Sequence, residues 1–217
     1  NRLSAFTAPP VVEEPQQSCS ATGSILREQW DNVGGNDVIQ IPLNSMPSRS
    51  GQVASLHIEN AGDNYGARLR GWVVPPVTGT YTFWIASNDN SELWLSTDAN
   101  AANRRRIAYV TGYTNVREWG KYTTQKSAAI SLVANQKYYI EALHKEGVGT
   151  DHVAVGWQLP DGTLEQPIGG SRLSPFEISE SDLAITDERA SDASRYSQIS
   201  VYPNPAQNTD GELTISG

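Results

Sequence analysis

The chain has 217 residues, of which 38% are hydrophobic and 18% charged, and its formal net charge is −8. This size suits one domain of ~150–200 residues with tails. No apolar run approaches the ~20 residues that a membrane helix needs, so we predict no membrane insertion. The single cysteine, Cys19, cannot form an internal disulfide and indicates neither a redox compartment nor a role.

The charge is unevenly distributed along the chain. Residues 23–176 hold 14 acidic and 13 basic side chains, and the excess of acids lies in the two tails. A near-neutral body argues against a nucleic-acid partner, because phosphate binding requires an excess of Lys and Arg. The one basic run, residues 104–106, is therefore interpreted as a solvated face.

Composition also divides the chain into segments. Residues 1–22 are rich in proline and glutamine, and we expect a linker that leaves an upstream domain. Residues 23–176 carry the apolar patterns of a domain body. Residues 177–198 are acidic and serine-rich, which predicts a second linker. Residues 199–217 resume a strand-like pattern, so we expect flexible tails with at most a short hairpin at the end.

The body begins with short extended pieces around Ile25, Trp30 and residues 38–41, and a candidate strand covers residues 53–58. The stretch from Tyr65 to Leu95 organises the rest of the body, because it contains three predicted strands and two turns. The first of these strands, residues 68–74, ends at two prolines, which cannot continue a central strand.

The second strand of this stretch, residues 80–86, shows strict alternation. Tyr81, Phe83 and Ile85 share one face, and β-branched and aromatic residues with this period indicate a strand. The third strand starts at Leu93. Between them we expect a polar hairpin tip over residues 87–91.

The second half of the body continues the same pattern. We predict a strand at residues 107–110, a surface flap over 111–126, and a hairpin formed by residues 128–133 and 137–143. A glycine-rich loop at 146–151 precedes a strand at 153–159. The turn Pro160-Asp161-Gly162 stops that strand, and a last short strand is expected at 164–168. Many short strands with sparse helix signals predict an all-β protein, an antiparallel sandwich or barrel.

The expected hairpin tip carries Asn88, Asp89 and Asn90. Short oxygen-bearing side chains on a loop suit hard cations and sugar hydroxyls, but on the residues alone an ordinary Asx-rich turn is the favoured interpretation. The residues alone leave both interpretations open.

No hydrolase motif is present, since the chain contains neither G-x-S-x-G nor H-E-x-x-H. His144 with Glu146, or His152 with Asp151, has the composition of a metal site or an acid–base pair, but both pairs are interpreted as solvent-facing strand ends. Glu141 and Glu146 are candidates for a glycosidase carboxylate pair by residue type alone, and the favoured interpretation puts Glu141 on a sheet face near Lys145.

Four tryptophans, at positions 72, 84, 94 and 157, fall in predicted strands, and we expect most of them in the core. Trp119, Tyr113 and Tyr122 fall in the expected flap. An exposed ring there would suit stacking on a sugar, and an edge plug is the equal alternative for Trp119.

Several motifs together resemble the protective-antigen-type domain, the β-sandwich module of anthrax protective antigen, yeast flocculins and bacterial glycosidases. They are GSILREQW, YGARLRGWVVPPVTGTYTFWIASNDNSELWLS, REWGKYTTQKSAAISL and KYYIEALHKEGVGTDHVAVGWQLPDG. The resemblance covers roughly residues 23–176. It implies an antiparallel β-sandwich and, in many members, carbohydrate binding.

In flocculin-like members, two consecutive Asp residues joined by a cis peptide bind calcium, which chelates two sugar hydroxyls. The matching positions here are Asn88 and Asp89, and the second ligand loop matches residues 146–151. The resemblance thus implies a calcium site of Asn88, Asp89, Gly147, Gly149 and Asp151, and a sugar site of Asn88, Asp89, Asn90, Trp119 and Glu146. Asn88 departs from the family pattern and removes one charge, which weakens the expected calcium affinity.

The last residues, ISVYPNPAQNTDGELTISG, resemble the start of the C-terminal sorting domain of type IX secretion cargo from gram-negative bacteria. This implies a secreted or outer-membrane-surface location. The function expected from the sequence is a calcium-dependent carbohydrate-binding or adhesion module, not itself an enzyme, monomeric, with a glycan or polysaccharide as partner. The alternative is a spacer domain with a decayed sugar site, attached to an upstream polysaccharide-degrading enzyme.

Overall fold

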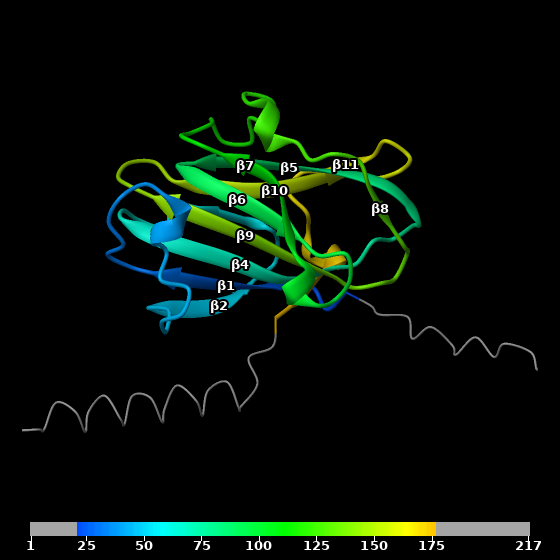
Figure 1. Ribbon diagram of the computed structural model, residues 1–217, viewed down its shortest axis with the longest axis horizontal. Helices are drawn as coiled ribbons and strands as arrows, with labels where there is room; N and C mark the ends of the chain where they lie inside the picture. Colours follow the sequence, from blue (N-terminus) through cyan, green and yellow to red (C-terminus); the bar gives the residue numbers. More distant parts are fainter. Residues whose placement is uncertain (1–20, 177–217) are drawn as a thin grey trace, which may run out of the picture. The chain divides into compact units, whose positions relative to one another are not determined.

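The computed structural model describes residues 21–176, which form two antiparallel β-sheets (Figure 1). The expectations for the N-terminal linker and for residues 177–217 fall almost entirely outside these residues. The all-β sandwich predicted from the sequence is confirmed, because the helical elements among residues 21–176 are four single 3-10 turns. None of the described helices is long and apolar enough to span a membrane.

One sheet has seven strands in the order β2-β1-β4-β9-β6-β7, with β12 beside β4. The other has five, in the order β11-β10-β5-β8, with β3 beside β10. The strands are β1 (Ile25–Trp30), β2 (Arg49–Val53), β3 (His57–Glu59), β4 (Tyr65–Val73), β5 (Gly79–Asn88), β6 (Asn90–Leu95), β7 (Arg105–Val110), β8 (Ile130–Leu132), β9 (Tyr138–Glu146), β10 (His152–Gln158), β11 (Leu164–Glu165) and β12 (Leu173–Pro175).

The core lies between the two sheets and follows the alternation of the strands. Tyr81, Phe83 and Ile85 on β5 are fully buried, as their shared face predicts. Trp157 on β10 lies against this row, with its ring centroid 4.9 Å from that of Tyr81 and 5.6 Å from that of Phe83. Aromatic rings at these separations bury a large apolar area in one layer of the core.

The tryptophan expectation is corrected by the structure. Trp157 is fully buried, but Trp72, Trp84 and Trp94 are half-buried on the outward faces of their strands. Successive side chains of a strand point to opposite faces of the sheet. Each of these tryptophans is one residue away from a core residue of its strand, so it faces outward. These three rings therefore lie at the protein surface and are partly exposed to solvent.

Two predicted hairpins are also wrong. β5 and β6 are consecutive in sequence, but β5 pairs with β8 and β10 whereas β6 pairs with β7 and β9. The turn around Asp89 therefore crosses from one sheet to the other. In the same way β8 joins β5, while β9 lies between β4 and β6, so the segment between β8 and β9 is a second crossing.

A second, smaller core covers part of the outward face of the seven-stranded sheet (Figure 1). It is built from the end of β1 and the segment that follows, which contains the 3-10 turn η1 (Val38–Gln40). Its buried members are Trp30, Val33, Val38, Ile41 and, from β9, Leu143. Asp37 caps η1 by accepting a hydrogen bond from the Ile39 amide, 3.1 Å. This packing fixes the position of residues 36 and 37 beside β6.

The expected flap over residues 111–126 lies between β7 and β8 and contains the 3-10 turn η3 (Thr123–Gln125). Gln125 is buried and donates from Nε2 to the carbonyls of Ile85 and Glu118. It therefore anchors this segment to β5.

Candidate functional site

The turn between β5 and β6 and the loop between β9 and β10 lie side by side. Asn88 is paired with His152 at the start of β10, and Asn88 Nδ2 donates to Thr150 Oγ1, 3.2 Å. The Asn88–Asp89 peptide bond is cis, as the resemblance implies. Ser87 Oγ donates to the Asp89 carbonyl, 2.6 Å, and fixes the turn from inside. The two loops that the sequence paired by resemblance are thus brought together.

Three side chains meet at Gly147. The Gly147 amide donates to Asp89 Oδ2, 3.1 Å. A Cβ atom at Gly147 would lie 3.0 Å from Asn36 Oδ1 and 3.1 Å from Asp89 Oδ2, so the absence of a side chain leaves space for these two oxygens. Glu146 Oε2 accepts from the Asp89 amide, 3.0 Å. Asp89, Asn36 and Glu146 therefore present oxygens around one glycine.

Glu146 is the most perturbed acid of this cluster. Its side chain is fully buried, and Oε1 is a buried oxygen without a hydrogen-bond partner among the described residues. Burial raises the pKa of the Glu146 carboxyl to about 7, with further contributions from the nearby charges of Asp89, Asp151 and Asp63. A buried carboxylate oxygen without a partner, beside other acids, marks this cluster as a candidate functional site.

This shift predicts a pH effect on stability. The pKa of Glu146 is raised on folding, so its contribution to stability is fully present below pH 4.5 and is lost as the pH rises through 7. Without metal, Glu146→Gln is expected to stabilise the protein at pH 8 by about 1 to 3 kcal/mol and to flatten this slope. Thermal unfolding in chelator between pH 4.5 and 8 measures both effects. A wild-type slope that persists in the variant would assign the titration to another group.

Asp151 has a different role from Asp89. Its Oδ2 atom accepts from the buried Tyr65 hydroxyl, 2.6 Å, and from the Ala61 amide, 2.7 Å. Burial, together with the smaller effect of the hydrogen bond to Asp151, raises the pKa of Tyr65 far above its ordinary value of 10.0. Asp151 thereby ties the β9–β10 loop to the segment between β3 and β4.

The two histidines are not solvent-facing, which corrects the sequence-based interpretation. His144 and His152 are both buried. Burial lowers the pKa of His144 to about 4, so its ring is neutral at physiological pH. His144 Nε2 lies 2.8 Å from the Asn88 carbonyl and Nδ1 lies 3.2 Å from the Tyr65 hydroxyl. The neutral ring thus lies between the Tyr65 hydroxyl and the Asn88 carbonyl and supports the Asn88 backbone.

The glycosidase pairing is not supported by the strand geometry. Glu141 faces outward on β9, where it accepts from the Tyr139 hydroxyl, 2.6 Å, whereas Glu146 lies on the inward parity of the same strand. The two carboxylates therefore face opposite sides of the sheet. Across residues 21–176, no three His, Cys, Asp or Glu side chains are placed to hold a metal by themselves, so a cation here would need amide and carbonyl oxygens.

The other predicted site residues mainly hold the two loops in place. Gly149 donates to Asp63 Oδ1, 2.9 Å, which fixes the glycine-rich loop. Asn90 Oδ1 accepts from the Gly112 amide, 2.6 Å, so this amide side chain braces the end of β7. Trp119 is half-buried in the 111–126 segment, and no hydrogen bond among the described residues joins it to Asp89.

Two residues next to the cluster were not named in the predicted site, although Tyr113 was among the aromatic residues considered for stacking on a sugar. Tyr113 forms an isolated bridge with Asn88, is 56% exposed, and has Lys121 Nζ 3.8 Å from its ring centroid. Asn36 lies 53 residues before Asp89 in the sequence. The aromatic residues of the polar 111–126 segment were a sequence pattern that pointed to Tyr113. The approach of Asn36 to Asp89 depends on the packing of the small core, and no local sequence pattern predicts it.

The chain belongs to the PA14 domain family, whose model matches residues 55–169. These residues include both loops of the cluster, and this is the family of the sequence resemblance.

Among curated proteins, the chain is 39% identical over 125 residues to mouse N-acetyl-beta-glucosaminyl-glycoprotein 4-beta-N-acetylgalactosaminyltransferase 1. It is 29% identical over 126 residues to mouse fibrocystin-L. The matches cover 55% and 58% of this chain but 12% and 3% of those proteins. The similarity therefore concerns one module of much longer chains.

Solved structures share the fold at low sequence identity. The PA14 sugar-binding domain from an RTX adhesin is 14% identical, with a TM-score of 0.55, over 72% of this chain and all of that one. The epithelial adhesin 9 A domain from Candida glabrata, solved with Galβ1-4GlcNAc, is 12% identical, with a TM-score of 0.52, over 74% and 91% of the two chains. At these identities the likeness establishes the sandwich fold alone.

Proposed function

We propose that residues 21–176 form a carbohydrate-binding module whose sugar site is the turn at Asn88–Asp89 together with the loop at Glu146–Asp151, and that calcium bridges this site to two sugar hydroxyls. The oxygens beside Gly147 carry the proposal: Asp89 Oδ2 and Asn36 Oδ1 lie next to it, and the adjoining Glu146 has an unpartnered buried oxygen, Oε1. Calcium binds six to eight oxygens, including carboxylate, amide and backbone carbonyl groups, and these are the groups that the two loops contain.

Each residue would have a defined part in this site. Asp89 is the anionic ligand, and Asn88 offers its amide oxygen because Nδ2 already donates to Thr150. Glu146 contributes negative charge next to Asp89. Asp151 already accepts hydrogen bonds from Tyr65 and Ala61, so its part is to hold the β9–β10 loop in position. Tyr113 offers an exposed ring beside Asn88 on which the apolar face of a sugar can stack.

The loss of one charge at Asn88 sets the expected affinity. We expect a dissociation constant for calcium of ~10⁻⁴–10⁻³ M, the range of extracellular modules. Such a site functions in calcium-rich surroundings, which agrees with the proposed location of the module outside the cell or on its surface. The second candidate function is a spacer domain, and it is favoured by the absence of three metal-ligating acids and histidines among the described residues.

The test is calcium titration by calorimetry, and then a glycan array with and without chelator, on the wild type and on Asp89→Ala. We expect Asp89→Ala to abolish calcium binding and glycan binding together. Asp161→Ala is the matched control, because it removes an exposed acid from a turn outside the proposed site, and it should bind like the wild type.

Each alternative has its own outcome. Glycan binding that survives both chelator and Asp89→Ala would place the sugar site elsewhere, with Trp119 the first residue to test. A protein that binds neither calcium nor any glycan on the array would support the spacer function.

A further inference from the structure

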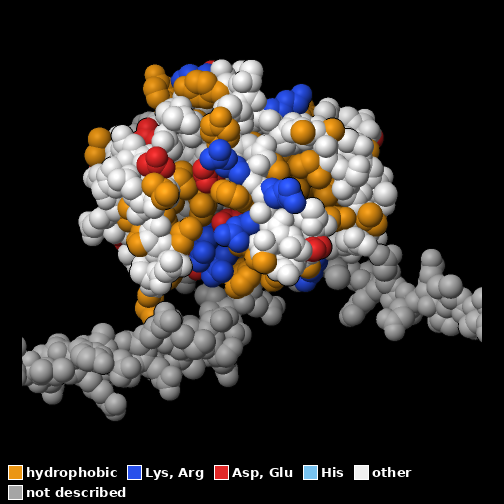
Figure 2. Space-filling view, viewed as in Figure 1, with side chains coloured by type: hydrophobic (Ala, Val, Ile, Leu, Met, Phe, Trp, Pro, Cys, Tyr) orange, Lys and Arg blue, Asp and Glu red, His pale blue; other side chains and the backbone are white. Residues whose placement is uncertain are grey.

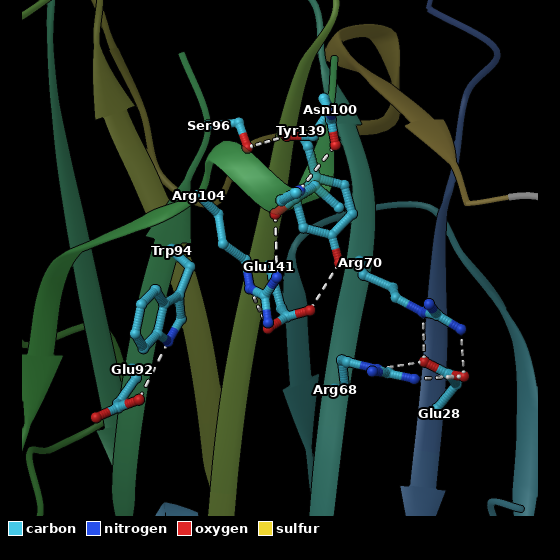
Figure 3. A network of polar contacts seen from close by, with 12 residues as sticks. Glu28, Arg68, Arg70, Glu92, Trp94, Ser96, Asn100, Arg104, Tyr139 and Glu141 are labelled. Carbon is cyan, nitrogen blue, oxygen red and sulfur yellow. Dashed lines mark hydrogen bonds and ion pairs between the residues drawn. The ribbon is translucent and has the colours of Figure 1, made fainter. Parts of the chain in front are cut away.

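The strand that leaves the Asp89 turn carries a polar and aromatic row on its outward face. In β6, Ser91, Leu93 and Leu95 are buried, so Asn90, Glu92 and Trp94 share the opposite face. Trp94 Nε1 donates to Glu92 Oε2, 3.1 Å, and this contact is visible in Figure 3. From Asn90 to Trp94 the strand extends about 13 Å, which is longer than one sugar ring.

A groove lies over Asn90 and Glu92 of this row, and Trp94 follows beyond its lining. Its first part has a volume of about 290 Å³, with Asn90 and Glu92 at its base, η1 on one side and Arg106 and Tyr109 of β7 on the other. Its second part has a volume of about 330 Å³ and shares Asp37, Val38 and Glu92 with the first. The rest of its lining is apolar and consists of Ile39, Ile41, Leu43 and Leu143. Together the two parts reach the size of a small-ligand site.

The groove begins at the proposed sugar site. Asn36, whose amide oxygen lies beside Asp89 at Gly147, directly precedes Asp37 in the groove wall. Asn90 is the residue directly after Asp89 and forms part of the groove base. A chain of sugars that left the Asp89 site on this side would therefore enter the groove.

The polar side chains of the groove can bind the hydroxyl groups of a sugar. Asp37 and Glu92 are carboxylates that can accept from hydroxyl groups, and Arg106 pairs with Glu92 and lies 4.6 Å from the Tyr109 ring centroid. Half-buried Trp94 lies outside the lining of both parts, next to Glu92 on the same strand face, with its indole near Arg104. Asp37 and Glu92 are balanced by Arg106 and by Arg104 near Trp94, so the charge around the groove is close to neutral and suits an uncharged ligand. Figure 2 shows hydrophobic side chains interspersed with acidic and basic ones on this face.

We propose that this groove is an extension subsite, in which Glu92 and Trp94 bind further residues of a neutral oligosaccharide whose terminal sugar is held at Asp89. The inference rests on the proposed function and adds to it a preference for chain length. The module should therefore bind oligosaccharides with higher affinity than monosaccharides.

The experiment compares galactose, Galβ1-4GlcNAc and a tetrasaccharide of two such repeats in calorimetric titrations with calcium. The wild type should bind the tetrasaccharide at least about tenfold more tightly than galactose. Trp94→Ala and Glu92→Gln should each remove about three- to tenfold of the tetrasaccharide affinity and leave galactose binding unchanged. Glu92→Gln keeps an acceptor for the Trp94 indole, so it tests the groove even if Trp94→Ala weakens the fold.

The matched control is Trp84→Ala, which removes a half-buried outward tryptophan from β5 in the other sheet. It should bind all three sugars like the wild type. Equal affinity of the wild type for galactose and the tetrasaccharide overturns the extension subsite while the proposed function stands. Galactose binding that is lost with either groove variant also overturns it. A wild type that binds none of the three sugars overturns both proposals for this class of glycan.

Discussion

Replacing Glu28 by alanine is expected to lower the free energy of unfolding by about 3 to 5 kcal/mol. Glu28 Oε2 accepts from Arg68 Nε, 2.6 Å, and from Arg70 Nε, 2.8 Å, and its side chain is 3% exposed (Figure 3). Both arginines are themselves largely buried on β4. Removal of the carboxylate leaves two guanidinium groups side by side without compensation, and urea unfolding at pH 7 measures the cost.

The control variant breaks an ion pair that is exposed to solvent, so it shows how much of the effect is due to burial. Asp31→Ala breaks an ion pair with Arg49 in which both side chains are accessible to solvent, and solvent screening limits its cost to about 1 kcal/mol or less. Equal losses for Glu28→Ala and Asp31→Ala would contradict the assignment of Glu28 as a buried anchor.

The same carboxylate makes the stability of the wild type fall at acidic pH. Burial by itself would raise the pKa of Glu28, but the hydrogen bonds from Arg68 and Arg70 outweigh it and hold the pKa below its ordinary value of 4.5. The contribution of Glu28 to stability is therefore present above pH 4.5 and is lost as the pH falls through its folded-state pKa. Glu28→Ala should lose less stability than the wild type below pH 4.5.

Asp151→Ala is expected to lower the free energy of unfolding by about 2 to 4 kcal/mol in the absence of calcium. The substitution leaves the Ala61 amide without its acceptor, and the buried Tyr65 hydroxyl keeps only the longer contact with His144 Nδ1, 3.2 Å. The β9–β10 loop would then lose its tie to the segment between β3 and β4, so glycan affinity should fall as an indirect result. Thermal unfolding in chelator gives the stability, and glycan titration gives the effect on the site.

Asp161→Ala again provides the comparison. Asp161 lies exposed in the turn between β10 and β11, where it accepts from the Thr163 amide, 2.9 Å, and its loss should leave the unfolding midpoint close to that of the wild type. If Asp151→Ala kept wild-type stability in chelator and abolished calcium binding, Asp151 would be a metal ligand and not an anchor.

Local patterns were sufficient to predict most of the fold. The alternation of Tyr81, Phe83 and Ile85 determines which face of β5 is buried, and the turn at Pro160-Asp161-Gly162 ends β10 close to the predicted point. The pairing of the Asn88–Asp89 turn with the glycine-rich loop came from the family resemblance. A period of two does not determine the partner of a strand, so the two hairpins expected from sequence proximity were wrong.

The sequence by itself determined an all-β domain, most of its strands and the buried face of β5, and its family resemblance indicated the two loops of the candidate site. The tertiary structure alone decided that Glu28 meets Arg68 and Arg70 from the neighbouring strand, and that Asn36 approaches Asp89 and Gly147. It also decided that His144 and Glu146 are buried at a strand end with a polar appearance. The physical reason is that burial and pKa depend on atoms brought from distant parts of the chain, whereas side-chain alternation depends on the backbone geometry of one strand.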